Sequence, residues 1–231
     1  MARVTLDSTP SLLRYQDGSR SLLLKRARVA DAEALMEALE ESLPELREFM
    51  SWAHRGNSLE IQRDRLKETE AQRDSGGEIC FHIFEKEGGP FLGSIGLIRA
   101  RVINPLGLEL GYWTRTSAAG RGLMTLAARC LYVLAFDYFG CERLQCFFDV
   151  NNKASERVSQ KTGFTEEARL RNFGPLATPE TMAQGDRSGP IMVLAAGFPE
   201  DRAEMDWYSA IAKNLEVLDE GGEIALPEFA L

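Results

Sequence analysis

Histidine is the rarest residue type in this 231-residue chain, and His54 and His82 are its only two copies. Zinc sites are built mainly from clustered His and Cys side chains, and the four cysteines contain no Cys-x-x-Cys pair. We therefore expect no metal centre. Three of the four cysteines, Cys80, Cys130 and Cys146, lie in apolar, strand-like or helix-like runs. Free cysteines pack as small apolar groups and stay reduced in the cytosol, which predicts buried thiols in a cytoplasmic protein.

Long apolar runs and an excess of basic residues are also missing. No stretch approaches the roughly 20 apolar residues that cross a bilayer. Residues 1–20 lack the apolar core of a signal peptide. The formal net charge is −8, which argues against nucleic acid as a direct partner. We expect a cytoplasmic protein that contacts neither membrane nor nucleic acid directly.

The sequence divides into three parts by pattern. Residues 1–20 are polar and are predicted to form a flexible N-terminal arm. Residues 21–198 alternate between strand-like and helix-like segments, which predicts one mixed α/β domain. Within it, Pro44 is predicted to open a second short helix after the one over residues 32–43. Residues 199–231 are predicted to form a helical extension and a poorly ordered tail.

The stretch "SAAGRGLMTLAAR", residues 117–129, places two glycines where a helix begins. The first N–H groups of a helix are free, and the positive end of its dipole attracts phosphate. Gly120 and Gly122 permit a close approach and a positive φ, and Arg121 adds a positive charge. A plain tight turn explains the same residues. The stretch matches neither the P-loop nor the Gly-x-Gly-x-x-Gly pattern, which disfavours a nucleotide triphosphatase and a Rossmann dehydrogenase.

From about Leu22 to Phe198 the chain resembles the GNAT family of N-acetyltransferases, in particular the RimJ/RimL-like branch that acetylates ribosomal-protein N-termini. Residues 119–124 are similar to the family's acetyl-CoA motif, Gln/Arg-x-x-Gly-x-Gly/Ala, with Gly122 at the central glycine. Ala119 replaces the usual Gln or Arg, and Met124 replaces a small residue. Three further stretches resemble the branch in the same order along the chain: "EESLPELREFMSWA", "LELGYWT" and "VNNKASERVSQKTGF".

The resemblance implies a GNAT fold, an α/β (α+β) domain with a central, mostly antiparallel mixed sheet of about seven strands flanked by helices. It also implies acetyl-CoA as the cosubstrate, and we expect a monomer or a homodimer. The coenzyme-binding residues that it implies are Trp113, Thr114, Ala119, Gly120, Arg121, Gly122, Leu123, Met124, Asn151 and Ser155.

Acetyl transfer to an amine needs a base that takes the amine proton and a donor that protonates the departing thiolate. Glu109 is the first candidate base, because strand alternation places it on the same face as Gly111 and Trp113. It would then lie beside the substrate channel if the resemblance holds. Asp149 is the second candidate, and a surface carboxylate or a helix cap explains it as well.

Ser155 matches the serine that this branch uses near the coenzyme sulfur, as a proton donor or an orienting hydroxyl. A serine in the first turn of a helix that bonds the backbone is the structural alternative. Asn151 or Asn152 would cap that helix and hold the amides of the coenzyme, and Asn151 joins Glu109 and Ser155 as a predicted catalytic residue. Cys146 has no histidine nearby in sequence, so we expect an inert thiol and direct transfer without an acetyl-cysteine intermediate.

The resemblance implies an amine acceptor, with a protein or peptide α-amine such as a ribosomal-protein N-terminus as the main expectation. A small-molecule amine, such as an antibiotic or an aminoacyl nucleotide, is an alternative acceptor. A noncatalytic acetyl-CoA-binding protein is a further alternative, because the first motif position is altered. Trp52 lies in the region expected to face the acceptor, and core packing explains it equally well.

Overall fold

A ten-stranded sheet forms the centre of the computed structural model, which describes residues 10–54, 56–74, 76–100, 106–173, 191–219 and 222–224. The strand order is β10-β9-β1-β2-β3-β4-β5-β6-β8-β7, and of these neighbours only β5 and β6 are parallel. The strands are β1 (Leu12–Gln16), β2 (Ser21–Arg26), β3 (Glu78–Phe84), β4 (Gly93–Arg99), β5 (Gly107–Thr114), β6 (Arg143–Asp149), β7 (Thr165–Arg171), β8 (Ile191–Gly197), β9 (Leu215–Asp219) and β10 (Gly222–Ile224).

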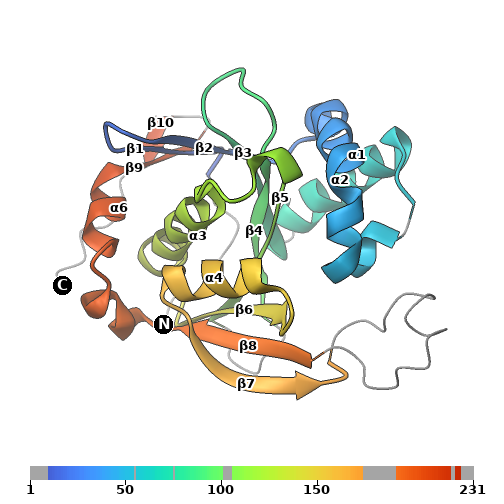
Figure 1. Ribbon diagram of the computed structural model, residues 1–231. Helices are drawn as coiled ribbons and strands as arrows, with labels where there is room; N and C mark the ends of the chain where they lie inside the picture. Colours follow the sequence, from blue (N-terminus) through green and yellow to red (C-terminus); the bar gives the residue numbers. More distant parts are fainter. Residues whose placement is uncertain are drawn as a thin grey trace.

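Helices cover both faces of this sheet and make a layered α/β fold (Figure 1). Two helices, α1 and α2, pack on one face around a smaller apolar core. The helices α3, α4 and α6 lie on the other side with the larger core. In the described ranges no helix has both the length and the apolar character that a membrane span requires. The helices are α1 (Ala32–Phe49), α2 (Leu59–Asp74), α3 (Leu123–Val133), α4 (Lys153–Thr162) and α6 (Tyr208–Asn214).

Helix α3 is the centre of the larger core. Residues such as Ala127, Leu131 and Val133 are fully buried, because this helix is apolar on almost every side and packs between the sheet and other helices. It continues into a π-helical turn, Leu134–Tyr138. A helix held on so many sides has little freedom to shift, so the position of its N-terminus is set by the packing of the core.

The mixed, mostly antiparallel sheet confirms the expected fold class, and residues 21–198 supply the expected seven strands, β2 to β8. The other three strands come from the two ends of the chain. Residues 12–16 were expected in a flexible arm and instead form β1, whose Leu13 and Tyr15 are buried. Alternation of buried and exposed side chains identifies a half-buried strand, and five residues were too few to distinguish it from a polar arm.

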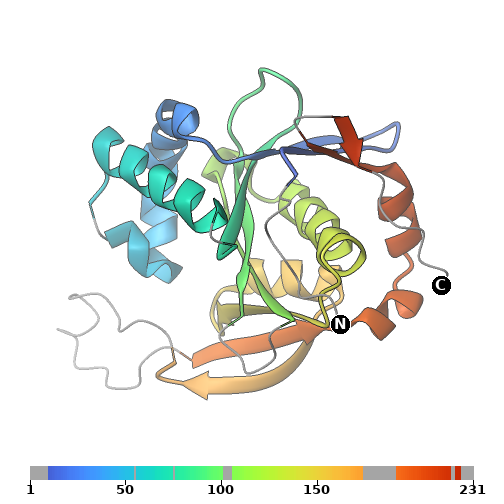
Figure 2. The same ribbon diagram turned by 180° about the vertical axis from the view of Figure 1, so that it is seen from behind.

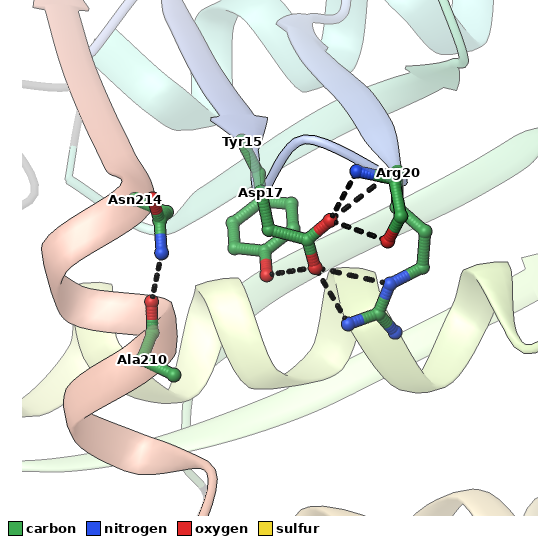
Figure 3. Close-up of polar contacts among 6 residues, drawn as sticks. Tyr15, Asp17, Arg20, Ala210 and Asn214 are labelled. Atoms are coloured by element: carbon green, nitrogen blue, oxygen red, sulfur yellow. Dashed lines mark hydrogen bonds and ion pairs between the residues drawn. The ribbon is translucent and has the colours of Figure 1, made fainter.

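A network around Asp17 closes the hairpin between β1 and β2 (Figure 3). The carboxylate of Asp17 accepts hydrogen bonds from the Tyr15 hydroxyl at 2.7 Å and from the Arg20 backbone N–H and guanidinium, each at 2.8 Å. These bonds hold the pKa of Asp17 well below its usual range. The hairpin is therefore anchored by one ionised side chain, although β1 lies near the end of the chain.

The C-terminal segment differs from the expected helix and tail. Of the described residues in this segment, only Tyr208–Asn214 is α-helical, and Leu215–Asp219 forms β9, which pairs with β1. In the view from behind, this segment runs along the outer side of α3 and back to the sheet edge (Figure 2). Leu215 and Val217 are buried, and a strand puts both on one face. Tertiary pairing with β1 therefore overrides the helical pattern.

Helix α1 continues through Pro44, where the sequence pattern predicted the start of a second helix. Pro44 lies inside one continuous helix, Ala32–Phe49, and does not open a second one. A proline inside a helix loses one backbone hydrogen bond and costs about 3 kcal/mol. Leu39 and Leu46 are buried on either side of it, and their packing offsets that cost. The unbroken helix brings its last turn close to the site described below.

A buried ion pair fastens the C-terminal segment to α3. The Asp137 carboxylate accepts hydrogen bonds from the Arg202 guanidinium at 2.7 Å and from the Tyr208 hydroxyl at 2.8 Å. The side chain of Asp137 is only 9% exposed and that of Arg202 19%. The charges therefore compensate each other in a poorly hydrated place, where removal of one partner is costly.

We expect Asp137→Ala to lower the free energy of unfolding by about 3 kcal/mol, because it leaves the Arg202 guanidinium without its buried counter-ion. Glu200→Ala is the matched control, since Glu200 is an exposed acid on the same C-terminal segment. Its effect should stay within about 0.5 kcal/mol. Urea unfolding followed by fluorescence measures both values. Equal stability of the two variants would show that the pair does not anchor the segment.

Candidate active site

Strands β5 and β6 are paired over only part of their length. Their parallel register runs from Gly107 opposite Arg143 to Glu109 opposite Gln145. Beyond that point β5 continues to Thr114 in register with β4 alone, and β6 continues in register with β8 alone. The facing edges of two central strands therefore carry backbone N–H and C=O groups without a partner strand, as an edge strand does.

A cavity of about 340 Å³ lies beside the separated end of β5. The last residues of β5, from Tyr112 to Thr114, form one wall. The C-terminal turns of α1 form a second wall, and the residues that lead into α3 form a third. Side chains of α4 complete the cavity. Segments far apart in sequence thus meet around one space.

The glycine-rich loop before α3 is open toward this cavity. Gly120 and Gly122 both line it and have φ values of +75° and +76°, which favour glycine. A Cβ at either position would meet no atom within 4 Å. Within the described residues, no protein acceptor takes up the backbone N–H groups of residues 120–122. The loop therefore offers free N–H donors at the N-terminus of α3.

The N-terminus of α4 faces the same cavity. Asn152 is its N-cap, and the Asn152 side-chain oxygen accepts a hydrogen bond from the Ser155 N–H at 3.0 Å. The Ser155 hydroxyl lies 2.8 Å from the Tyr112 hydroxyl on β5. Asn152, Ser155 and Tyr112 all line the cavity. Since each helix N-terminus carries a partial positive charge, two such ends favour negative charge inside it.

Helix α1 is tied to the segment that leads into the glycine loop. The Arg115 guanidinium bonds to Glu41 at 2.5 Å and to Glu37 at 2.8 Å. The second oxygen of Glu41 accepts the Ser117 N–H at 2.7 Å. The bonds from Ser117 and Arg115 lower the pKa of Glu41 to about 2. One carboxylate thus joins the wall of the cavity to its loop.

Most residues predicted to bind a coenzyme do line the cavity, and two do not. Arg121 pairs with Glu85 at 2.5 Å, and the Asn151 N–H donates to the Asp149 carboxylate at 2.8 Å in the turn after β6. Asn152 rather than Asn151 caps α4. The predicted residues that line the cavity are Trp113, Thr114, Ala119, Gly120, Gly122, Leu123, Met124 and Ser155.

The other residues singled out from the sequence, including Glu109, do not line the cavity. Glu109 is half-buried at the last position where β5 pairs with β6. Its carboxylate accepts a hydrogen bond from the Gln145 amide at 3.3 Å. Trp52 packs edge-on against Trp113, with ring centroids 6.4 Å apart. Cys146 is buried, and burial raises the pKa of its thiol to about 12. Nowhere in the described ranges do three His, Cys, Asp or Glu side chains gather as a metal site needs.

Several cavity residues were missed from the sequence. Glu45, Phe49 and Met50 reach the cavity from α1, and the expected helix break at Pro44 had hidden the continuity of that wall. Arg157 and Lys161 line it from α4. Their spacing of four residues places both on one face of a helix. Two cationic residues at this spacing after the predicted N-cap are the sequence signal that could have identified them.

Three comparisons with known proteins identify the family and the fold of the chain. Residues 21–165 match the family model described as an acetyltransferase (GNAT) domain. The "Probable N-acetyltransferase YjcK" of Bacillus subtilis (strain 168) is 26% identical over 156 residues, which cover 66% of this chain and 84% of that protein.

Solved structures with the same fold include RimJ of Mycobacterium smegmatis in complex with CoA-disulfide. It has a TM-score of 0.72 and 18% identity, and the match covers 93% of this chain and 99% of that one. Another is RimL, a ribosomal L7/L12 alpha-N-protein acetyltransferase in complex with coenzyme A. It has a TM-score of 0.69 and 19% identity, with 80% and 97% covered.

Because the pKa of Glu41 is lowered, we expect its contribution to the stability of the folded protein to depend on pH. A carboxylate whose pKa is lowered in the folded state stabilises that state fully above its unfolded pKa, about 4.5. This contribution is lost as the pH falls toward about 2. Urea unfolding should therefore show that Glu41→Gln is less stable than the wild type at pH 6. The difference should shrink below pH 4.5.

Glu40→Gln is the matched control, because Glu40 is an exposed neighbour on the same helix. It should follow the wild type at every pH. A Glu41→Gln defect that stays constant from pH 6 to pH 3.5 would mean that the charge of Glu41 does not tie α1 to the loop.

Proposed function

This chain belongs to the GNAT acetyltransferase family, and we propose from that premise that it transfers the acetyl group of acetyl-CoA to the α-amino group of a protein or peptide. The acyltransferase class follows from the family match over residues 21–165. The proposed setting is the cytoplasm, since all four cysteines are free thiols, as expected in a reducing compartment.

The observation that carries the proposal is the meeting of two helix N-termini in one cavity. Gly120 and Gly122 present free N–H groups from the α3 side, and Ser155 presents a hydroxyl from the α4 side. Backbone N–H groups at a helix N-terminus suit a pyrophosphate. A hydroxyl at the second N-terminus suits a sulfur on which negative charge develops. Both requirements belong to a thioester of coenzyme A.

The rest of the cavity suits the same ligand. Arg157 and Lys161 add two cationic side chains to the α4 wall, and phosphate groups pair well with such cations. The free edges of β5 and β6 offer N–H and C=O groups to the amides of an extended ligand, as a sheet edge does to an added strand. Residues 118–124 and the first turns of α4 would hold the coenzyme by these contacts.

The chemistry then needs three events. The neutral amine attacks the thioester carbon, the C–S bond breaks, and the sulfur gains a proton while the amine loses one. Ser155 donates its hydroxyl hydrogen bond to the departing sulfur, and the α4 N-terminus stabilises the negative charge there. Cys146 stays a thiol because burial raises its pKa to about 12, which supports direct transfer without a covalent acetyl-enzyme.

Two carboxylates compete for the role of base. Glu109 lies where β5 and β6 separate, on the face of the sheet that α1 covers. Glu45 lines the cavity itself and accepts the Thr116 hydroxyl at 3.2 Å. We propose Glu109, acting through water, because the separated strands give an amine on the α1 side a path toward the thioester. Glu45 is exposed, and it suits an incoming ammonium group at the entrance.

The acceptor proposal rests on the α1 wall and on one relative. Phe49 and Met50 give this wall apolar surface next to the carboxylate of Glu45, which matches the start of a peptide that carries a positive α-amino group. The structure of RimL, whose name describes a ribosomal L7/L12 alpha-N-protein acetyltransferase, shares the fold. We propose a protein N-terminus as acceptor on these two grounds.

The direct test is release of free thiol from acetyl-CoA in the presence of peptide pairs. One peptide has a free α-amine, and its twin has a formyl-blocked α-amine and an internal lysine. At pH 7 an α-amine is unprotonated about two hundred times more often than a lysine, so only the first peptide should react rapidly. Equal rates would indicate a side-chain acceptor. Release with small amines alone, or no release, would overturn the proposal in favour of a small-molecule enzyme or a coenzyme-binding protein.

Gly122→Val tests the glycine loop. A valine Cβ would occupy the open space before α3 and resist a φ of +76°. At a hundredfold excess over Kd, acetyl-CoA should stabilise the wild type by about 2.7 kcal/mol, a rise in Tm of about 5–10 °C. The variant should lose this rise.

Gly140→Val is the matched control, because Gly140 also has positive φ and open space around its Cβ but does not line the cavity. It should lose similar intrinsic stability, about 2 kcal/mol, and keep the full acetyl-CoA shift. A normal shift in a folded Gly122→Val protein would place the phosphates elsewhere.

Glu109→Gln tests the base through its pH dependence. Turnover should fall most near pH 6 to 7, where the amine is mainly protonated. The defect should shrink above the amine pKa of about 8. Glu45→Gln is the comparison and should raise the KM for the peptide without that pH profile. A pH-dependent defect in Glu45→Gln alone would transfer the role of base to Glu45. A constant defect in Glu109→Gln would leave Glu109 with a positioning role.

A further inference from the structure

The hydroxyl of Tyr112 contacts Ser155, the proposed hydrogen-bond donor to the coenzyme sulfur. It lies 2.8 Å from the Ser155 Oγ and 3.3 Å from the backbone carbonyl oxygen of Ser155. Tyr112 comes from β5 and Ser155 from α4, so the contact crosses the cavity edge between two separate elements. Most serines in the first turn of a helix bond their own backbone, whereas this hydroxyl is held by another side chain.

The role of this contact depends on which of the two hydroxyl groups donates its hydrogen to the other. Each hydroxyl carries one hydrogen and can accept two hydrogen bonds. If Tyr112 donated to the Ser155 carbonyl, the Ser155 hydrogen would point back at Tyr112. The 2.8 Å contact is a hydrogen bond in either direction. An acceptor atom in the cavity, such as the coenzyme sulfur, can take up the Ser155 hydrogen only when Tyr112 donates to Ser155 Oγ instead. In that arrangement the hydrogen of Ser155 is free to point into the cavity.

Two further features keep this arrangement in place. Burial raises the pKa of the Tyr112 hydroxyl well above its usual range, so the phenol keeps its hydrogen at any working pH. The backbone of Ser155 is fixed independently, because its N–H donates to the Asn152 side chain at 3.0 Å. The backbone of Ser155 is thus fixed, and the Tyr112 hydroxyl remains available as a hydrogen-bond donor to the Ser155 hydroxyl.

We propose that Tyr112 is a positioning residue for acetyl transfer, which donates a hydrogen bond to Ser155 Oγ and thereby directs the Ser155 O–H toward the coenzyme sulfur. The proton that reaches the sulfur as the C–S bond breaks comes from Ser155. Glu109 takes the amine proton through water, and Ser155 recovers a proton from the water of the site. Tyr112 keeps its own proton throughout. This inference rests on the role of Ser155 proposed above.

A double-mutant cycle of Tyr112→Phe and Ser155→Ala tests the inference. Loss of one neutral hydrogen bond should lower kcat of Tyr112→Phe about fivefold to tenfold, with the KM for acetyl-CoA unchanged. Ser155→Ala should lower kcat at least as much. In the Ser155→Ala background Tyr112→Phe should have no further effect, because no hydroxyl remains to be directed. The Tyr112→Phe defect should also be constant from pH 6 to pH 9.5.

Tyr132→Phe is the matched control, since it removes the hydroxyl of a buried phenol that does not line the cavity and should leave kcat unchanged. If Ser155→Ala retains full turnover, the role of Ser155 fails and the inference fails with it. If Ser155→Ala is slow and Tyr112→Phe lowers kcat equally in both backgrounds, Ser155 keeps its role and Tyr112 does not act through it. A larger KM for acetyl-CoA with unchanged kcat in Tyr112→Phe would likewise overturn the inference.

Discussion

The separation of β5 from β6 is the constraint on which the rest of the site depends. Their parallel register ends at Glu109 and Gln145, and each strand then continues beside a different neighbour. The crossover between two adjacent parallel strands is α3, which has to return through the core to reach β6. The start of α3 and the start of α4 both follow the ends of strands that lean apart, and both therefore face the space between them. Without the separation, sheet pairing would fill the region in which we propose that the coenzyme lies.

The charged groups around the cavity differ in balance from the net charge of the whole chain. The chain has a net charge of −8, yet the cavity collects two helix N-termini and two cationic side chains, Arg157 and Lys161, against one carboxylate, Glu45. The acidic groups of α1 nearest the loop are occupied, since Arg115 pairs with Glu37 and Glu41. A local positive field in a negative molecule guides an anionic ligand to one place. The same ion pairs hold the α1 wall of the cavity against the segment that leads into the glycine loop.

The sequence predicted the elements whose patterns are local. Residues 21–198 supply the expected seven strands, and the glycines at 120 and 122 stand at the start of a helix with positive φ. The predictions that were wrong concern segments whose pattern is short or contradictory. Pro44 is tolerated inside α1 because the residues around it bury apolar side chains. The segment 215–219 is a strand because β1 is beside it, and no local signal reports a partner more than 190 residues away in sequence.

Composition and spacing alone determined the fold class and pointed to a glycine loop that suits phosphate, because helix periodicity, strand alternation and glycine's freedom at positive φ are properties of neighbouring residues. Strand alternation indicated Glu109 as a candidate base, and the resemblance to the family implied the role of Ser155. Only the tertiary structure decided that Tyr112 stands behind the Ser155 hydroxyl, that Asn152 and not Asn151 caps α4, and that Glu45 reaches the cavity. Each of these depends on how two elements pack against one another. A distance of a few ångströms between side chains on different elements is set by the whole core and by no single segment.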